Sequence, residues 1–195
     1  MKLRLLLLAT ASAAAVTALN AQAISYGNYE LAGLVGSGSN TSVCVFDFGS
    51  TTTHQYAFGY AYDGTKTGAD LLMALNDAPI GVSVDLTYYE GMGYLVNSIS
   101  YMTYSISSTL TAPYQSPCYW TGNSGTAGPT AWTSSSIGIS SRVLTNGTWD
   151  GFSQGTWVGY DIVADAPSGA FAAVPEPAAL SLLALGGLAL LRRRR

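Results

Sequence analysis

Aromatic and small residues alternate strictly over positions 56–62, and this alternation constrains the fold more than any other feature of the chain. The segment reads YAFGYAY, so a ring stands at every second position. Successive side chains of a β-strand point to opposite faces, and the four rings are therefore expected on one face of a sheet. We interpret this face as part of the core. The alternative is an exposed stripe that stacks on sugar rings.

Similar short segments, rich in aromatic and β-branched residues, occur through the interior between turns of Gly, Ser and Thr. The predicted strands are residues 29–35, 42–48, 55–62, 81–89, 93–99 and 101–107. The final strands are expected around Trp149, Trp157 and Ile162. Residues 121–141 contain ten Ser or Thr and four Gly, which indicates a long surface loop or an irregular edge.

Dipeptides that end in glycine mark the expected turns. Asn146-Gly147 lies between apolar segments and predicts a hairpin. Asp63-Gly64 and Asp150-Gly151 predict two further turns. The carboxylates of these two pairs are thereby explained without assigning them a chemical role.

One helix is expected, from Thr67 to Asp77. It opens with the T-x-x-D pattern of a capped helix start, which places Asp70 near the positive end of the helix dipole. The apolar face consists of Leu71, Leu72 and Leu75. Pro79 follows the expected end. Together with the strands, this helix predicts a mainly β domain of the α+β class, either a β-sandwich or a β-grasp-like layer.

The order of motifs after residue 66 is similar to that of a known small domain. A helix with paired leucines is followed by a Gly-aromatic-x-Val strand at Gly93–Val96, a Tyr119-Trp120 pair, and a Gly-x-Trp turn at Gly147–Trp149. This order resembles the β-grasp domain at the end of cobalamin-carrier proteins. The resemblance implies a fold only and carries no ligand residue to this chain.

The first 23 residues have the three parts of a secretory signal peptide. Lys2 and Arg4 precede the apolar run Leu5–Ala9, and small residues continue to the A-x-A site Ala21–Ala23. A buried N-terminal helix is the alternative, but it would need a polar face that this segment lacks. We predict export, with cleavage by signal peptidase after Ala23.

The other end repeats an apolar run with a different ending. Pro175, Glu176 and Pro177 precede the uncharged residues 178–191. The chain then ends in Arg192, Arg193, Arg194 and Arg195. At about 1.5 Å per residue, a helix over 178–191 would span about 21 Å. This is short for a hydrocarbon core of about 30 Å. Arginines favour the cytoplasmic side, so we expect a marginal transmembrane helix with its end inside.

A Pro-Glu-Pro motif, a short apolar helix and an arginine cluster, in this order over residues 174–195, resemble the PEP-CTERM sorting tail. In that family, a membrane protease-transpeptidase called exosortase recognises the tail, mostly in Gram-negative bacteria that make exopolysaccharide. The resemblance therefore implies an exosortase substrate that is first anchored in the inner membrane and then sorted to the cell surface or extracellular matrix. Prolines cannot enter the helix, so the motif is expected to be extended and accessible.

Between the two ends, the sequence predicts one β-rich extracytoplasmic domain over residues 24–163 and a linker over 164–173. From residue 24 to residue 173, two basic residues, Lys66 and Arg142, stand against ten acidic ones, a net charge near −8. So few cations exclude nucleic acid as a partner. The acidic excess is interpreted as a source of solubility.

Cys44 and Cys118 are the only cysteines. In an exported protein an even number favours pairing, and we predict a disulfide between them. Two free buried thiols are the alternative. A zinc site is not expected, since His54 is the only histidine and no C-x-x-C motif occurs.

No motif predicts catalysis. His54 would have to be the base of any triad, but it lies in a polar turn, and no G-x-S-x-G motif exists. The carboxylates available to a glycosidase are Glu30, Asp85, Glu90 and Asp150, which the sequence cannot bring together. Asp47 and Asp63 lack the spacing of a calcium loop. We expect no enzyme, metal or cofactor.

The leading functional hypothesis is therefore a non-enzymatic surface or extracellular-matrix protein. The first alternative is a carbohydrate-binding module for exopolysaccharide, suggested by thirteen tyrosines and four tryptophans. A polysaccharide hydrolase is the second alternative.

Overall fold

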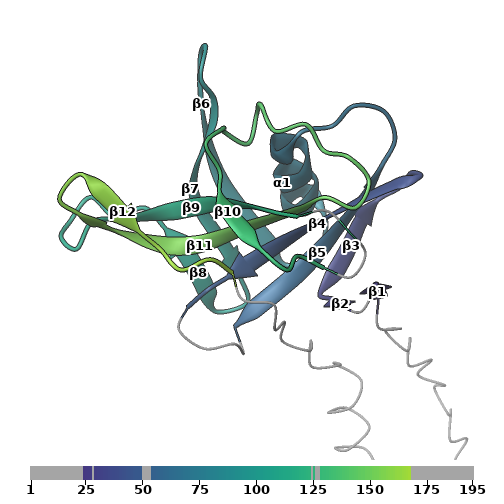
Figure 1. Ribbon diagram of the computed structural model, residues 1–195, viewed down its shortest axis with the longest axis horizontal. Helices are drawn as coiled ribbons and strands as arrows, with labels where there is room; N and C mark the ends of the chain where they lie inside the picture. Colours follow the sequence, from purple (N-terminus) through teal and green to yellow (C-terminus); the bar gives the residue numbers. More distant parts are fainter. Residues whose placement is uncertain (1–23, 28, 50–53, 124, 126–127, 168–195) are drawn as a thin grey trace, which may run out of the picture. The chain divides into compact units, whose positions relative to one another are not determined.

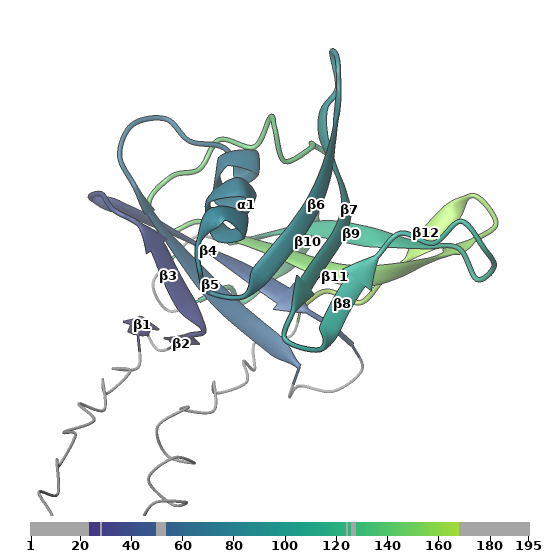
Figure 2. The same cartoon turned by 180° about the vertical axis from the view of Figure 1, so that it is seen from behind.

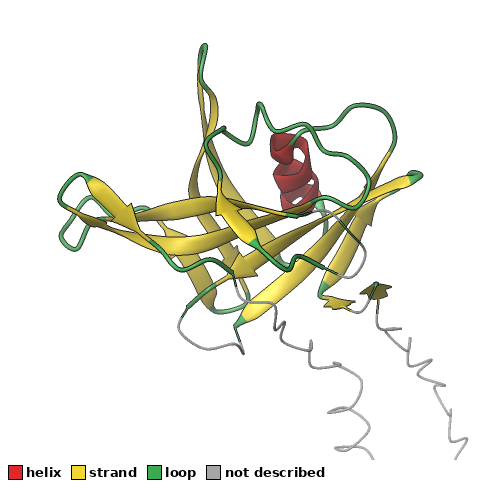
Figure 3. Ribbon diagram, in the orientation of Figure 1, coloured by secondary structure: helices red, strands yellow, loops and turns green. Residues whose placement is uncertain are grey.

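The computed structural model describes residues 24–27, 29–49, 54–123, 125 and 128–167 (Figure 1). It confirms a mainly β fold with one short helix (Figure 3). The predicted signal peptide with its cleavage site at Ala23 and the tail over 174–195 lie outside these residues.

Twelve strands and one helix make up the described part of the chain. They are β1 (Ile24–Tyr26), β2 (Tyr29–Leu31), β3 (Gly33–Gly36), β4 (Asn40–Asp47), β5 (Gln55–Tyr62), α1 (Gly68–Asp77), β6 (Val82–Tyr89), β7 (Gly93–Tyr101), β8 (Tyr104–Ser107), β9 (Gln115–Gly122), β10 (Trp132–Ser134), β11 (Trp149–Val158) and β12 (Asp161–Val163).

A seven-stranded sheet forms the centre of the domain. Six strands follow the order β10-β9-β11-β4-β5-β3, and β12 pairs with the far end of β11. Strand β11 runs parallel to β4, and β3 runs parallel to β5, whereas the other neighbours are antiparallel. The long β11 therefore joins the first and last thirds of the domain.

A three-stranded antiparallel sheet, β6-β7-β8, crosses one face of the large sheet (Figure 2). Its register shifts between Asp85 and Leu86. The short pair β1-β2 is separate from both sheets. The strands after α1 are thus divided between two sheets rather than forming the single β-grasp-like layer that was one of the two predicted forms.

The main core lies between the two sheets and α1. The four rings of the alternating segment, Tyr56, Phe58, Tyr60 and Tyr62, are all buried on this side of β5. Tyr101 of β7 contacts two of them, with ring centroids 4.9 Å from Tyr56 and 5.0 Å from Phe58. The stripe is core, as predicted, and is not available for sugar stacking.

A smaller core lies on the other face of the large sheet. Trp149 is fully buried there, together with Leu31, Val43, Val45 and Ala57. The Tyr29 ring meets Trp149 edge-on at 5.2 Å. The indole N–H donates a 2.7 Å hydrogen bond to the carbonyl of Gly125. Both faces of the sheet are therefore covered at its centre.

The helix begins where the T-x-x-D pattern predicted. Thr67 is the N-cap, and its hydroxyl accepts a hydrogen bond from the Asp70 N–H at 3.3 Å. The Asp70 carboxylate in turn accepts from the Thr67 N–H at 2.7 Å, which completes a capping box. The buried leucines are Leu71, Leu72 and Leu75.

The predicted turn at Asp150-Gly151 and the predicted hairpin at Asn146-Gly147 were wrong, although residues 146–147 do form a turn. Asp150-Gly151 lies inside β11, where both residues are buried. Asn146-Gly147 is no hairpin, because the Asn146 side chain and the Gly147 N–H bond the backbone of Thr41 and guide the chain into β11 alongside β4. The hairpin instead turns at Gly159, between β11 and β12. Strand β9 was not predicted.

Candidate functional site

A buried carboxylate lies at the junction of the large sheet, α1 and the loop before β11. Asp150 is 2% exposed, and its Oδ1 accepts from the Tyr119 hydroxyl at 2.9 Å and from Arg142 Nε at 3.3 Å. Within the described residues, Oδ2 has no hydrogen-bond partner and Arg142–Asp150 is the only ion pair. The Arg142 carbonyl also accepts from the Gly68 N–H at the start of α1.

Burial dominates the proton equilibria of this cluster. Desolvation raises the pKa of Asp150, although Arg142 and the Tyr119 hydroxyl oppose the shift. Burial and the nearby carboxylate raise the pKa of Tyr119 far above its usual value. They also raise the pKa of the Cys44 thiol. Tyr119 and Cys44 are consequently neutral, and a neutral buried thiol is a poor nucleophile.

The predicted disulfide between Cys44 and Cys118 is wrong, since both cysteines are free. Cys44 in β4 lies opposite Asp150 of β11, and Cys118 in β9 lies opposite Ser153. The two cysteines are thus separated by two strand spacings, about 10 Å, which exceeds the roughly 7 Å that a disulfide can bridge. Their partners stand three positions apart on β11, so the thiols also point to opposite faces of the sheet.

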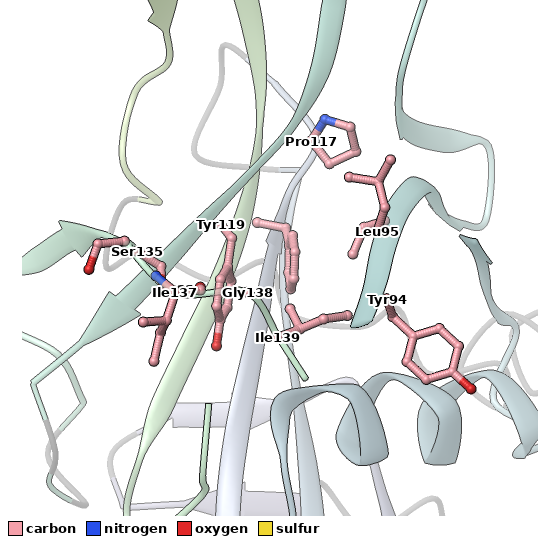
Figure 4. A pocket seen from close by; sticks show the side chains of 11 residues that line it. Tyr94, Leu95, Pro117, Tyr119, Ser135, Ile137, Gly138 and Ile139 are labelled. Atoms are coloured by element: carbon pink, nitrogen blue, oxygen red, sulfur yellow. Dashed lines mark hydrogen bonds between the residues drawn. The ribbon is translucent and has the colours of Figure 1, made fainter. Parts of the chain in front are cut away.

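A pocket of about 290 Å³ opens beside the Tyr119 ring (Figure 4). Tyr94, Leu95 and Val96 of β7 line it together with Pro117 and Tyr119 of β9, the segment 135–139, and Phe152. The Tyr119 and Phe152 rings stack with centroids 5.0 Å apart. Most of this lining is aliphatic or aromatic, and only the serines and the tyrosine hydroxyls are polar.

A second pocket, of about 380 Å³, lies at the far end of β9 and β11. Its walls are Ser108, Thr109, Leu110, Tyr114, Gln115, Ser116, Trp157 and Gly159. Here the aromatic side chains are exposed instead of buried, with Trp157 43% and Tyr114 53% accessible. This end of the large sheet, comprising residues 108–116 and 157–163, is called the aromatic arm below. Figures 1 and 2 both show it projecting away from α1.

The remaining candidate residues are dispersed. His54 stacks on Tyr104, with ring centroids 4.3 Å apart. Asp47 accepts from the Gln55 side chain at 2.7 Å, whereas Asp63 accepts from the N–H and hydroxyl of Ser39. These two acids therefore have separate structural roles.

The four carboxylates considered for hydrolysis do not gather around one pocket. Asp85 bonds Asn97 within the small sheet, Glu90 lies in the exposed turn between β6 and β7, and Glu30 is exposed in β2. Asp150 is buried, although its position at the core was not predicted from sequence. Among the described residues, no group of three or more His, Cys, Asp or Glu could hold a metal ion.

Comparison with known proteins identifies one feature. Residues 173–195 match the PEP-CTERM protein-sorting motif, which includes Pro175, Glu176, Pro177 and the four terminal arginines. No curated protein and no solved structure matches the chain. In the part of the chain that the structure describes, no helix is both long and apolar enough to cross a membrane. The expected span over 178–191 lies outside that part.

Proposed function

We propose that the chain is a non-enzymatic protein of the cell surface or extracellular matrix, delivered there by its sorting tail. The observation that carries the proposal is the match of residues 173–195 to the PEP-CTERM motif, which implies an exported substrate of exosortase. The signal peptide predicted over residues 1–23 agrees with this route. Signal peptidase and exosortase are then the processing partners, and the inner membrane holds the chain before processing.

The chemistry of the domain supports a role without catalysis. The buried Asp150 is bonded to Tyr119 and Arg142, and the only histidine stacks on a tyrosine ring. A hydrolase would need two carboxylates facing one substrate bond. Asp150 is buried in β11 and Glu90 lies in the exposed β6–β7 turn, so this pair offers no such geometry.

Carbohydrate binding is the second candidate function, and one observation favours it. The aromatic arm exposes a tryptophan and a tyrosine beside a pocket with neutral polar walls. Exposed rings of this kind provide apolar faces for the C–H-bearing face of a sugar. Exopolysaccharide at the cell surface would be the natural ligand of a protein sorted to the same place.

The test of the sorting proposal is the intact mass of the protein recovered from the cell surface. The full chain would be expressed in a Gram-negative host with an active exosortase and in the same host without it. We expect a surface form that lacks both the first 23 residues and the arginine cluster, and only in the exosortase-containing host. A surface form that still ends at Arg195 in that host would refute processing.

The proposal that the protein is not an enzyme is tested separately. The protein recovered from the surface would be incubated with a panel of polysaccharides, and reducing ends would be counted. We expect no release above that of a heat-unfolded sample. Release that disappears in Glu90→Gln or Asp150→Asn would establish the hydrolase instead.

A further inference from the structure

The aromatic arm places two rings at directly opposite positions on neighbouring strands. The N–H of Trp157 donates a 2.9 Å hydrogen bond to the carbonyl of Tyr114, which extends the β9–β11 pairing by one step. Side chains at opposed positions point to the same face, with Cβ atoms about 5 Å apart. The indole and the phenol can thus serve together as one extended apolar surface.

Both rings are only partly covered by the domain, with Trp157 43% and Tyr114 53% accessible. Among the described residues, neither the Trp157 indole N–H nor the Tyr114 hydroxyl makes a hydrogen bond, and neither ring packs against another aromatic ring. Two other tryptophans behave differently: the buried Trp149 and the half-buried Trp120 both donate their indole N–H groups within the domain. Burial of the ring surface that is still exposed therefore requires a molecule from outside.

Neutral polar groups surround the same pocket. Ser108 and Ser116 line it, and within the described part of the chain neither hydroxyl makes a hydrogen bond. Two hydroxyls supply both donors and acceptors. An apolar surface with a few such groups at its margin matches a ligand that has apolar C–H faces and many hydroxyls.

Charge narrows the class of ligand. No charged side chain lines the pocket, and the nearest charged residue of the arm in sequence, Asp161, is acidic. Of the two basic residues of the domain, Arg142 is already paired with Asp150. A domain with a net charge near −8 repels an acidic polymer. A neutral ligand meets no such barrier.

From these observations we infer that the pocket between Trp157 and Tyr114 binds a neutral polysaccharide, with sugar rings stacked on the two aromatic side chains and sugar hydroxyls bonded to Ser108 and Ser116. The inference deepens the carbohydrate-binding candidate, and it rests on the proposed location of the protein among surface polysaccharides. It requires no change in the covalent structure of either molecule.

The test uses the mature protein recovered from the cell surface and gels that contain one polysaccharide each. The neutral probes are a glucan, a mannan and a galactan, and the acidic probe is alginate. We expect retardation by at least one neutral polymer and none by alginate. Trp157→Ala should weaken the binding by at least about fivefold, which corresponds to the loss of a stacking contact of about 1 kcal/mol. Tyr114→Ala should weaken it to a similar degree, whereas Trp157→Phe, which keeps a ring, should retain more binding than Trp157→Ala.

Tyr88→Ala is the matched control, because Tyr88 is 61% exposed on the β6–β7 hairpin and belongs to neither pocket. It should bind like the wild type. The inference is overturned if no neutral polymer retards the protein, if alginate retards it most, or if Trp157→Ala binds unchanged. Self-association that depends on Trp157 without any glycan retention would also overturn it and assign the arm to a second copy of the chain.

The outcome is independent of sorting. Trp157→Ala should be exported and trimmed like the wild type, as judged by intact mass. A correctly processed protein that binds no glycan would refute the binding site and leave the sorting proposal in place. A protein that binds glycan but keeps its arginines would refute the sorting proposal and leave the binding site in place.

Discussion

Asp150 connects three parts of the domain through one oxygen, and its burial determines how it responds to pH. Burial raises the pKa of Asp150 by desolvation, and this effect is larger than the lowering caused by the guanidinium of Arg142. The pKa of this carboxyl is therefore higher in the folded protein than in the unfolded chain. Over the interval between the two values, the native state binds more protons, and the free energy of unfolding falls as the pH rises from about 4.

Asp150→Asn should remove this pH dependence while preserving the shape of the side chain. We expect the stability advantage of the wild type over the variant to decrease as the pH rises above about 4, with a slope of at most about 1.4 kcal/mol per pH unit. Urea unfolding of both proteins at several pH values between 4 and 7 measures the difference between their free energies of unfolding. Asp161→Asn, at an exposed position in β12, is the control and should show no such slope. A wild-type advantage that grows with pH would mean that the ion pair outweighs desolvation.

The two cysteines lead to a second prediction at this scale. Alkylation of the unfolded, unreduced protein should add two groups, because the thiols are on opposite faces of the sheet. In the native protein, the half-buried Cys118 should react and the fully buried Cys44 should not. Burial raises the pKa of both thiols, so the native reaction is slow. Mass spectrometry counts the groups, and an unfolded protein that takes none until reduced would restore the disulfide.

Local sequence patterns predicted those elements whose conformation depends on residues close together in the chain. The alternation over 56–62 was enough to identify β5 and its buried face, and Thr67 with Asp70 was enough to locate the start of α1. Strand β9 has no comparable signal, since its eight residues are all half-buried and include Pro117. Its existence depends on pairing with β11, which is distant in sequence.

The same distinction explains the errors at the site. Asp-Gly is a frequent turn sequence, but at Asp150-Gly151 the partners on both sides of β11 impose an extended backbone. Gly151 has a further packing reason, because a Cβ there would lie 2.8 Å from Pro167 and 2.9 Å from Trp132. The order of the strands also explains why the cysteines do not pair. Strand β11 lies between β4 and β9 in the sheet, and the spacing of residues in the sequence does not reveal this.

The capping box of α1 provides a prediction at the scale of the element. Thr67→Ala removes the hydroxyl that accepts from the Asp70 N–H, and it should lower the free energy of unfolding by about 1 kcal/mol. Thr65→Ala, at an exposed position just before the helix, should change it by less than about 0.5 kcal/mol. Chemical unfolding followed by tryptophan fluorescence compares the two. Equal effects would show that the cap does not stabilise the helix.

On the scale of the whole molecule, the chain combines a domain with few basic residues and a tail that ends in four of them. The domain has two basic residues, and the last four residues of the chain supply four. This separation suits a protein whose folded part crosses the membrane while its end stays behind, because arginines oppose translocation. The sorting role was predicted from the tail alone, whereas the proposed glycan site depends on the exposed rings of the arm.

Replacing Arg192 to Arg195 by serine tests the function of this charge. Each arginine opposes transfer of the end across the membrane, so the variant should lose its fixed topology. We expect a mixed population in which part of the protein keeps its tail and is inaccessible to exosortase. Protease protection in spheroplasts and intact mass report the two properties together. A variant processed as completely as the wild type would exclude a topological role for the arginines.

Replacing Pro175 and Pro177 by alanine tests recognition instead of topology. The two prolines interrupt helix formation just before the apolar run, so the motif is expected to present an extended backbone to a membrane protease. With alanines, the helix can continue through Glu176, and the backbone groups that a protease must bind become bonded within the helix. We therefore expect the variant to be exported with the normal topology but to keep its arginines, visible as a heavier intact mass in the membrane fraction. Ala178→Ser, which changes a neighbouring residue without a helix-breaking effect of comparable size, is the control and should be processed normally. If the double-alanine variant is trimmed as efficiently as the wild type, exosortase does not require an extended motif, and the apolar run and arginines alone must direct sorting.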